Sequence, residues 1–423
     1  MTNITSTSKS SKKSRRAPGQ GGLSKIKKNG KDYYRVAITV CYDEFGRQKK
    51  KYFYDTDKKK ALQKAKDYTS TLEKAPNIKD KDFTFKQWIE FYLYDFRFMD
   101  LKPSTFEKND AIYKNYFLSN TKFINQKLRD ISTINLQKYY NLLIEKGADP
   151  LTLKNNNKFI VTVFNEAIKQ GYIYLNPAKN VRFPKSTSKK VITVLTHDER
   201  KIFMESIKDT ELYLLFKVAI TTGFRLGEIL SLTWNDINFN DETITINKSL
   251  RRVKKIAINS KRNDIKIVST KEAIEDPSIK NVLIICPPKT ETSYRTNPIL
   301  PDLIQELKVL KSRQAIHRKS NPNYINNNLV FCDKNGYYLD SKKPERHFKK
   351  LLESNEISSI NFHCLRHTFA TILFEAGVEI KTVSSLMGHK NINITFDLYT
   401  HVMPEKKTDA ILKMQELFNS FYL

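Results

Sequence analysis

Hydrophobic residues recur with two different periods along this chain, and the change of period constrains the fold more than any other feature. Residues 23–54 alternate between apolar and polar side chains as β-strands do, with turn signals at Asn29-Gly30 and Glu44-Phe45-Gly46. From residue 57 onward the apolar residues recur mostly at helical spacing. The chain is therefore predicted to be multidomain and mainly α, with small β elements.

Unpatterned polar segments divide the 423 residues into several expected parts. A polar linker covers 76–82 and a basic linker covers 184–190, and neither shows an apolar period. The expected parts are a basic tail at 1–18, a small three-stranded sheet with one helix at 19–75, an all-α domain at 83–184, a mixed α+β domain at 191–408 and a C-terminal helix at 409–423.

Local signals mark the starts of helices in the expected all-α domain. Helices are predicted to begin at Pro103, after Ser132 and at Asp149-Pro150, where capping residues or proline precede apolar periodic segments. The aromatic stripes of these helices are predicted to form a core, in preference to platforms on which bases stack.

The larger domain mixes helices and strands. Thr196 and Glu199 form a capping-box pattern, and an apolar helix is predicted over 211–222. Strands are predicted over 243–253 and 281–285, with a long hairpin insertion in the charged stretch between them, 254–280.

The net charge points to a polyanionic partner. The chain carries 74 Lys and Arg against 45 Asp and Glu, a formal charge of +29 that far exceeds what solubility requires. Neutralising nucleic-acid phosphates releases condensed counterions and favours binding by such a chain. Membrane surfaces are the other polyanion, but no apolar run approaches the roughly 20 residues of a spanning helix, and the first residues contain no signal-peptide core. Nucleic acid is the favoured partner.

The chain shows no pattern for a metal or a cofactor. Its four cysteines, which are Cys41, Cys286, Cys332 and Cys364, are scattered and fit neither a zinc site nor a disulfide framework. No phosphate-binding glycine loop or metal-ligand cluster is evident. We therefore expect a cytoplasmic protein that uses neither.

The predicted N-terminal sheet is strongly basic. It carries Arg35, Lys49 and Lys51 beside tyrosines, as a sheet that lies in a DNA major groove would. This clustering favours DNA contact over a solvated sheet face. The tail at 1–18 holds five basic residues and no acidic one, which fits a solvated tail and a DNA-binding arm equally well.

A further set of residues carries chemistry. Arg225 and Glu228 are three residues apart, as are His363 and Arg366, so each pair shares a helical face. Gly388 has the position of a helix end that precedes His389, and Tyr399 follows ten residues later. Each piece alone has an ordinary explanation, such as a surface ion pair of little energy or a core tyrosine.

The order and spacing of this set resemble the tyrosine recombinase (phage integrase) family over about residues 190–405. The strings that carry the resemblance are Thr222-Gly-Phe-Arg-Leu-Gly-Glu, His363-Cys-Leu-Arg-His-Thr-Phe-Ala-Thr, Leu386-Met-Gly-His and Tyr399-Thr-His. The family's remaining catalytic residue is a lysine in a β-hairpin turn. The pattern Lys289-Thr-x-x-Ser-x-Arg makes Lys289 the candidate here, although an exposed turn lysine would look the same.

The resemblance implies a role for each residue. Tyr399 would be the nucleophile, and because a free phenol has a pKa near ~10 it needs a base or nearby positive charge. Arg225 and Arg366 would bind the phosphate oxygens of the transition state. His363 would act as a base, and His389 would act as a hydrogen-bond donor. Lys289 would protonate the leaving 5′ oxygen, and Glu228 would orient Arg225. The product would be a 3′-phosphotyrosyl bond, which rejoins without ATP or metal.

The resemblance also implies a biological setting. A basic N-terminal sheet, a helical clamp and a catalytic domain are similar to mobile-element integrases, which bind separate arm-type and core-type sites on double-stranded DNA. A homo-tetramer on DNA is then expected, with an accessory excision factor as a further candidate partner. The helix at 409–423 is expected to pack on a neighbouring protomer, with packing within one chain as the alternative.

Two other functions remain open from the sequence. A type IB-like topoisomerase uses similar residues, and strand joining between two duplexes separates it from a recombinase. The chain also fits a catalytically inactive DNA-binding protein on the same scaffold, although the presence of all six candidate residues argues against this.

Overall fold

The computed structural model describes residues 22–28, 31–42, 48–73, 83–185, 193–258, 263–288, 291–358, 360–402 and 406–421. Contacts divide the chain into two units, 1–96 with 109–187 and 97–108 with 188–423. Helices dominate, and the strands form three small sheets of three strands each within the described residues. The chain is thus multidomain and mainly α, as the sequence predicts.

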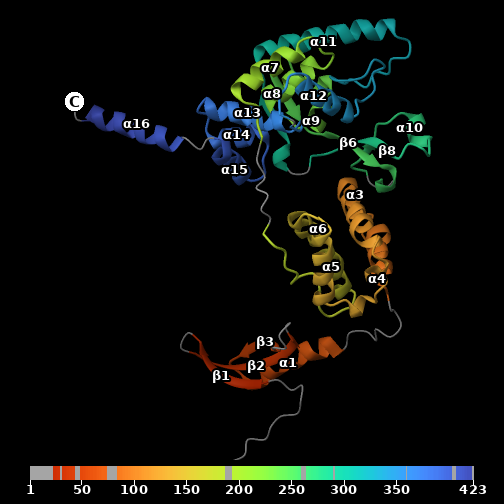
Figure 1. Cartoon of the computed structure of the whole chain (residues 1–423), viewed down its shortest axis with the longest axis vertical. Helices are drawn as coiled ribbons and strands as arrows, with labels where there is room; N and C mark the ends of the chain where they lie inside the picture. The colour runs from red at the N-terminus through yellow and green to blue at the C-terminus, as the bar shows by residue number, and fades with distance from the viewer. Residues whose placement is uncertain are drawn as a thin grey trace, which may run out of the picture. The chain divides into compact units, whose positions relative to one another are not determined.

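The N-terminal part is a three-stranded antiparallel sheet with one helix (Figure 1). The strands are β1 (Gly22–Lys28), β2 (Lys31–Tyr42) and β3 (Gln48–Asp55), and the helix is α1 (Lys58–Glu73). Val36 and Ile38 of β2 pack against Ala61 and Ala65 of α1, so α1 covers one face of the sheet. The predicted strands and helix are confirmed, while both predicted turns include residues outside the described ranges.

The next part is helical, and its predicted starts are confirmed. α3 begins at Pro103, α5 follows an N-cap at Ser132, and α6 begins at Pro150 after an N-cap at Asp149. The helices are α2 (Phe85–Glu90), α3 (Pro103–Ile112), α4 (Thr121–Ile124), α5 (Thr133–Glu145) and α6 (Pro150–Lys169), with a 3-10 turn η4 (Leu128–Asp130). Two π-helical segments, η2 (Phe91–Phe96) and η3 (Tyr113–Leu118), continue α2 and α3 and were not predicted.

Aromatic side chains fill the core of this helical part. Phe85 and Phe164 stack with centroids 5.2 Å apart, and both are fully buried. The indole of Trp88 donates to the carbonyl of Val163 at 3.1 Å. The prediction that the aromatic stripes form a core is confirmed.

Helices surround the buried centre of the second unit. α7 (His197–Ile207) begins with the predicted capping box of Thr196 and Glu199. The other helices are α8 (Tyr213–Thr222), α9 (Leu226–Ile229), α10 (Lys271–Glu275), α11 (Pro301–Ser320), α12 (Lys342–Ser354), α13 (Cys364–Glu375), α14 (Ile380–Met387), α15 (Ile392–Val402) and α16 (Lys406–Phe421), with 3-10 turns η5 (Trp234–Asp236), η6 (Lys255–Ala257) and η7 (Glu291–Ser293). Figure 1 shows α13 among α8, α14 and α15, which it contacts.

The strands of the second unit form two sheets. One has the order β4 (Ile237–Asn238), β5 (Thr243–Ile246) and β9 (Arg295–Pro298), and the other has the order β6 (Ser249–Lys254), β8 (Asn281–Cys286) and β7 (Lys266–Ile267). The strand predicted over 243–253 is therefore wrong as a single strand, because β5 and β6 belong to different sheets.

The insertion at 254–280 is richer than the predicted hairpin. β6 and β8 do pair along their whole length, from Ser249 with Cys286 to Lys254 with Asn281. The connection between them adds β7 at the edge of the sheet and the short helix α10. Across the residues that the structure describes, no helix is both long and apolar enough to cross a membrane.

Candidate active site

Arg225 and Glu228 are held where α8 meets α9. α8 ends at Gly223, whose φ of 64° is left-handed and suits glycine. Arg225 then caps α9: its backbone N–H donates to Glu228 Oε2 at 3.0 Å and its Nη1 donates to Oε1 at 2.7 Å. Glu228 is only 4% exposed, so this is a partly buried pair and not a surface ion pair.

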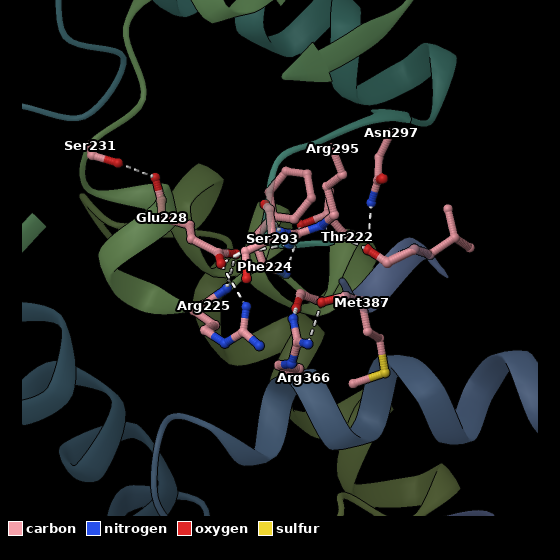
Figure 2. Close-up of polar contacts among 12 residues, drawn as sticks. Thr222, Phe224, Arg225, Glu228, Ser231, Ser293, Arg295, Asn297, Arg366 and Met387 are labelled. Carbon is pink, nitrogen blue, oxygen red and sulfur yellow. Dashed lines mark hydrogen bonds and ion pairs between the residues drawn. The ribbon is translucent and has the colours of Figure 1, made fainter. Parts of the chain in front are cut away.

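Arg366 is a buried cation that two helix ends hold. It is 2% exposed, its Nη1 donates to the carbonyl of Gly223 at 2.7 Å, and its Nη2 donates to the carbonyl of Met387 (Figure 2). These carbonyls end α8 and α14, where the helix dipole favours positive charge. Its Nε has no hydrogen-bond partner among the described residues. Burial and the charge of Arg225 lower the pKa of Arg366.

His363 caps the start of α13, one turn before Arg366. Its ring meets the ring of His367 edge to face, with centroids 4.9 Å apart. His363 is an exposed residue, yet burial of its ring by nearby protein atoms, followed by His367, Arg366 and Arg225, lowers its pKa to about 4. A neutral imidazole at this place can accept a proton.

His389 follows the left-handed end of α14 at Gly388, where φ is 63°. Its Nδ1 lies 2.8 Å from the hydroxyl of Thr395. When that hydroxyl donates to Nδ1, the ring proton is on Nε2, the remaining nitrogen. Burial, followed by Arg366 and Arg225, lowers the pKa of His389 to about 3.

Tyr399 lies on α15, the helix that also carries Thr395. The ring of Tyr399 packs edge to face on Phe374 of α13, with centroids 5.1 Å apart. Since α15 contacts both α13 and α14, the helix of the candidate nucleophile is fixed against the helix that carries Arg366 and the helix that ends just before His389. The structure thus brings Arg225, Arg366, His363 and His389 into mutual electrostatic contact.

Lys289 lies outside the described residues, so its place in the site stays a prediction. Its surroundings differ from the expected hairpin turn. β8 pairs with β6 and β7, whereas β9 pairs with β5. In the described residues β8 and β9 therefore belong to different sheets and do not pair, so these two strands do not form the expected β-hairpin.

Three further residues that the sequence did not single out join the site, and Figure 2 shows two of them, Arg295 and Asn297. Arg295 on β9 donates to Glu228 Oε2 at 2.8 Å, and Asn297 donates to the carbonyl of Leu386 at 2.7 Å. Thr395 contacts His389, as described above. Only Arg295 had a sequence signal, as the last residue of the pattern that suggested Lys289.

The basic residues predicted on the N-terminal sheet do not share one face. Arg35 pairs with Tyr54, donates to Ser24 Oγ at 3.0 Å and lies 5.2 Å from the ring centroid of Tyr52. Lys51 pairs with Ile38, which packs under α1, so it lies on the opposite face from Arg35. The side chain of Lys49 lies outside the described residues.

The described residues contain no group of three or more His, Cys, Asp or Glu side chains that could hold a metal ion. The site instead presents guanidinium groups and imidazoles, next to the helix that carries Tyr399. Such groups bind and stabilise anionic oxygens and move protons.

Comparison with known proteins agrees with this site. Residues 193–406 match the phage integrase family, and residues 84–144 match the phage integrase N-terminal SAM-like domain. A tyrosine recombinase XerC-like protein of Caldanaerobacter subterraneus subsp. tengcongensis is 35% identical over 400 residues, which cover 92% of this chain and 98% of that protein. The ICEBs1 integrase of Bacillus subtilis is 22% identical over 93% of this chain and 99% of that protein.

A solved structure of the Tn1549 transposon integrase in complex with a circular intermediate DNA has a similar fold. Its TM-score is 0.60 at 19% identity, over 79% of this chain and 99% of that one. The family match covers every residue of the candidate site, and the XerC-like protein is similar along almost its entire length. This chain therefore belongs to the phage integrase family, the tyrosine recombinases.

Proposed function

We propose that this tyrosine recombinase serves a mobile element and that Tyr399 is its nucleophile. The observation that carries the proposal is the convergence of two arginines and two histidines on one site, next to the helix that carries Tyr399. Attack of the Tyr399 oxygen on a DNA phosphate forms a 3′-phosphotyrosyl bond and releases a 5′-hydroxyl. The reverse attack by a 5′-hydroxyl rejoins the strand, and the bond energy is conserved throughout.

Arg225 and Arg366 stabilise the charge of the five-coordinate transition state. The Nε of Arg366 is buried without a hydrogen-bond partner among the described residues, while its two Nη atoms are held by backbone carbonyls. A phosphate oxygen at Nε would satisfy this donor. Since the guanidinium is already fixed in place, it stabilises the transition state without reorganising.

Proton transfer falls to the imidazoles and to Lys289. His363 has a lowered pKa and is neutral near pH 7, so it can accept the proton of Tyr399. His389 accepts a hydrogen bond from the Thr395 hydroxyl at Nδ1, and its Nε2–H can donate a hydrogen bond to a non-bridging phosphate oxygen. Lys289 protonates the leaving 5′ oxygen, and Glu228 orients Arg225 through two hydrogen bonds.

The N-terminal sheet is proposed to bind arm-type sites, while the helical and catalytic parts bind core-type sites on double-stranded DNA. Arg35 lies on the sheet face opposite α1, beside the half-exposed rings of Tyr52 and Tyr54. A cation beside aromatic rings on an open sheet face fits contact with DNA. Similarity to the ICEBs1 integrase over 93% of this chain supports the assignment to a mobile element.

Recombination joins two duplexes, so we propose that four protomers assemble on DNA in the cytoplasm. The exposed apolar side chains of α16 are proposed to pack on a neighbouring protomer. An accessory excision factor would set the direction of the reaction.

Covalent capture on a nicked half-site tests the assignment of Tyr399. The substrate carries the chain's own core site, which the junctions on either side of the encoding element reveal. Wild-type protein is expected to give a tyrosine-linked complex on a denaturing gel, whereas Tyr399→Phe gives none but still shifts the DNA on a native gel. Tyr174→Phe, a change at a half-exposed tyrosine of the helical part, is the matched control and retains the complex.

Two outcomes would contradict the proposal. A covalent complex that persists in Tyr399→Phe would show that another residue attacks. Relaxation of supercoiled DNA without joining of two core sites would identify the topoisomerase reaction instead.

A further inference from the structure

Arg295 is a buried arginine with several fixed partners. Its side chain is 7% exposed and lies on β9, outside the set of six candidate catalytic residues. Nε donates to the carbonyl of Leu386 at 3.0 Å, Nη1 donates to the carbonyl of Ser293 at 3.1 Å, and Nη2 donates to Glu228 Oε2 at 2.8 Å. All three nitrogens of the guanidinium therefore have a hydrogen-bond partner, and Nη1 also lies 3.5 Å from Glu228 Oε1.

The first connection runs from Arg295 to Arg225. Glu228 lies between them: Arg225 binds Oε1 at 2.7 Å and Arg295 binds Oε2 at 2.8 Å. Because one rigid carboxylate holds both guanidinium groups, the position of Arg295 limits where Glu228, and hence Arg225, can lie. Glu228 is 4% exposed, so little water is available to replace either partner.

The second connection runs from Arg295 to His389. Leu386, which accepts from Arg295, lies in the last turn of α14, and Asn297 donates to the same carbonyl. A Cβ added to Gly388 would lie 3.1 Å from both Cδ and Nη1 of Arg295. The backbone turn directly before His389 is thus packed against this one side chain.

We propose that Arg295 is a positioning residue that holds Arg225 and His389 in register with each other. It does so through Glu228 on one side and through the end of α14 on the other. The inference rests on the proposed function, because it assumes that both residues act on the same phosphate. Only arginine fits this role, since its planar fork reaches partners in several directions while a lysine ammonium is a single point.

The test measures strand cleavage at saturating DNA, separately from DNA binding. Arg295→Met is expected to lower the rate of covalent complex formation on the nicked half-site by about 100-fold, the size of effect seen when catalytic groups are misplaced by about 1 Å. Arg295→Lys keeps the charge and is expected to lose roughly 10-fold. The DNA concentration for half-maximal rate should change by less than about 3-fold in both variants, because Arg295 is buried away from solvent.

Arg200 provides a matched control. Like Arg295, its Nε donates to a backbone carbonyl, that of Leu195, at 2.9 Å, and its Nη atoms bind a carboxylate, that of Glu375, at 2.6 and 2.7 Å. Its hydrogen-bond partners in the described residues, Leu195 and Glu375, include none of the candidate catalytic residues. Arg200→Met and Arg200→Lys should lower the melting temperature by a similar amount and leave the cleavage rate at saturating DNA unchanged.

The pH profile supplies a readout that a loss of stability alone would not move. Burial raises the pKa of Glu228, but Arg295 and then Arg225 lower it below its ordinary value. Within the described part of the chain, Arg366 of α13 and His363 at its N-cap also interact electrostatically with this carboxylate. On the acidic side of the pH profile, the cleavage rate of Arg295→Met should therefore begin to fall at a higher pH than that of the wild type. In Arg295→Lys and in the Arg200 variants, this fall should occur at the same pH as in the wild type.

The result that overturns the inference is an Arg295→Met cleavage rate within about 3-fold of Arg200→Met, or a loss confined to DNA affinity. If Arg295→Met does not fold, the cleavage rate of Arg295→Lys is compared with that of Arg200→Lys, and rates within about 3-fold of each other overturn the inference. Failure of the proposed function itself looks different, because wild-type protein would then form no covalent complex, or Tyr399→Phe would still form one.

Discussion

At the level of single residues, the site surrounds two histidines with arginines. Arg366 and Arg225 both lower the pKa of His389, in addition to its burial, and they act on His363 in the same direction. Both imidazoles are thus neutral in the folded protein near pH 7. Neutral imidazoles add no positive charge of their own to the site, and each can accept a proton at a ring nitrogen that carries none.

This arrangement predicts how stability depends on pH. The pKa of His389 is about 3 when folded and about 6.5 when unfolded. Between these values only the unfolded chain binds the proton, so the free energy of unfolding should fall as pH falls from about 6.5 toward 3, by roughly 1 kcal/mol per pH unit over most of this range. Thermal unfolding of DNA-free protein at pH 7.5, 6.0 and 5.0 measures this dependence.

His389→Gln is the comparison that isolates this residue, because all other titrating groups remain. The difference in melting temperature between pH 7.5 and 5.0 should be smaller in the variant than in the wild type. An equal or larger difference in His389→Gln would mean that the pKa of His389 is not lowered in the folded protein.

Thr395 offers a second prediction at this scale. Its buried hydroxyl contacts His389 Nδ1 at 2.8 Å, which fixes the ring and its proton position. Thr395→Val keeps the shape but removes this partner, so the cleavage rate should fall by about 10-fold to 100-fold. DNA binding on a native gel should be unchanged.

Thr371→Val is the control for this change. Thr371 is similarly buried, and its hydroxyl donates to the carbonyl of His367 at 3.0 Å within α13. We expect wild-type cleavage from this variant. Equal losses in the two valine variants would argue that Thr395 acts only on stability.

These contacts show how far sequence reasoning reaches at single residues. The motif predicts Arg225, His363, Arg366, His389 and Tyr399 because those residues lie in short recognisable strings. Thr395 and Asn297 have no such string, since an ordinary threonine or asparagine gains a role only from folding. Asn297 contacts Leu386, 89 positions away in sequence, and no local pattern contains that information.

At the level of elements, two helix ends shape the site. Gly223 ends α8 and Gly388 ends α14, both with left-handed backbone. The carbonyl of Gly223 and that of Met387, directly before Gly388, both bind Arg366. The helices therefore contribute through their ends, where backbone carbonyls are not used by the helix itself.

Gly388→Ala should separate backbone strain from disruption of the site. A Cβ at this position would lie 3.0 Å from the backbone oxygen of Thr292 and 3.1 Å from Arg295, in addition to the cost of left-handed backbone, about 1–2 kcal/mol. We expect lower stability and a cleavage rate that falls by about 100-fold, because the turn before His389 must move.

Gly377→Ala is the matched control. Gly377 also has a positive φ, 79°, but nothing lies within 4 Å of an added Cβ. This variant should lose a similar strain energy while it retains cleavage at a temperature well below its melting point. Wild-type cleavage in Gly388→Ala would contradict the tight packing at that turn.

Elements differed in how well the sequence predicted them. Helix starts at Pro103 and Pro150 were predictable because caps and prolines act within one turn. The break between β5 and β6 was not, since their separation depends on pairing with β9 and β8 from later in the chain. The π-helical segments likewise have no simple periodic signal.

At the level of the whole molecule, the change of apolar period correctly predicted a small sheet followed by helical and mixed parts. The apolar period of a segment reflects which face of that helix or strand is buried, so it is the same in any arrangement of the domains. It carries no information about partners between protomers. The last helix, α16, raises that question most directly.

α16 exposes several large apolar side chains. Ile411, Leu412, Met414 and Leu417 are each 53% to 69% exposed, which is unusual unless another surface covers them. If a neighbouring protomer on DNA provides that surface, changing Ile411, Met414 and Leu417 together to serine should leave covalent capture on a single half-site within about 3-fold of wild type. Joining of two core sites should fall by about 10-fold or more, because assembly of several protomers weakens.

The control variant changes three other residues of α16, Lys413, Gln415 and Glu416, to serine. Its loss of helix propensity matches that of the apolar variant. This control should join core sites as the wild type does and form the same complexes on a native gel. If both triple variants recombine equally well, the apolar face of α16 has no partner in the assembled complex. If the apolar variant instead also loses covalent capture on a single half-site, α16 packs within its own chain. Its contacts would then be needed for the first cleavage, before any neighbouring protomer takes part.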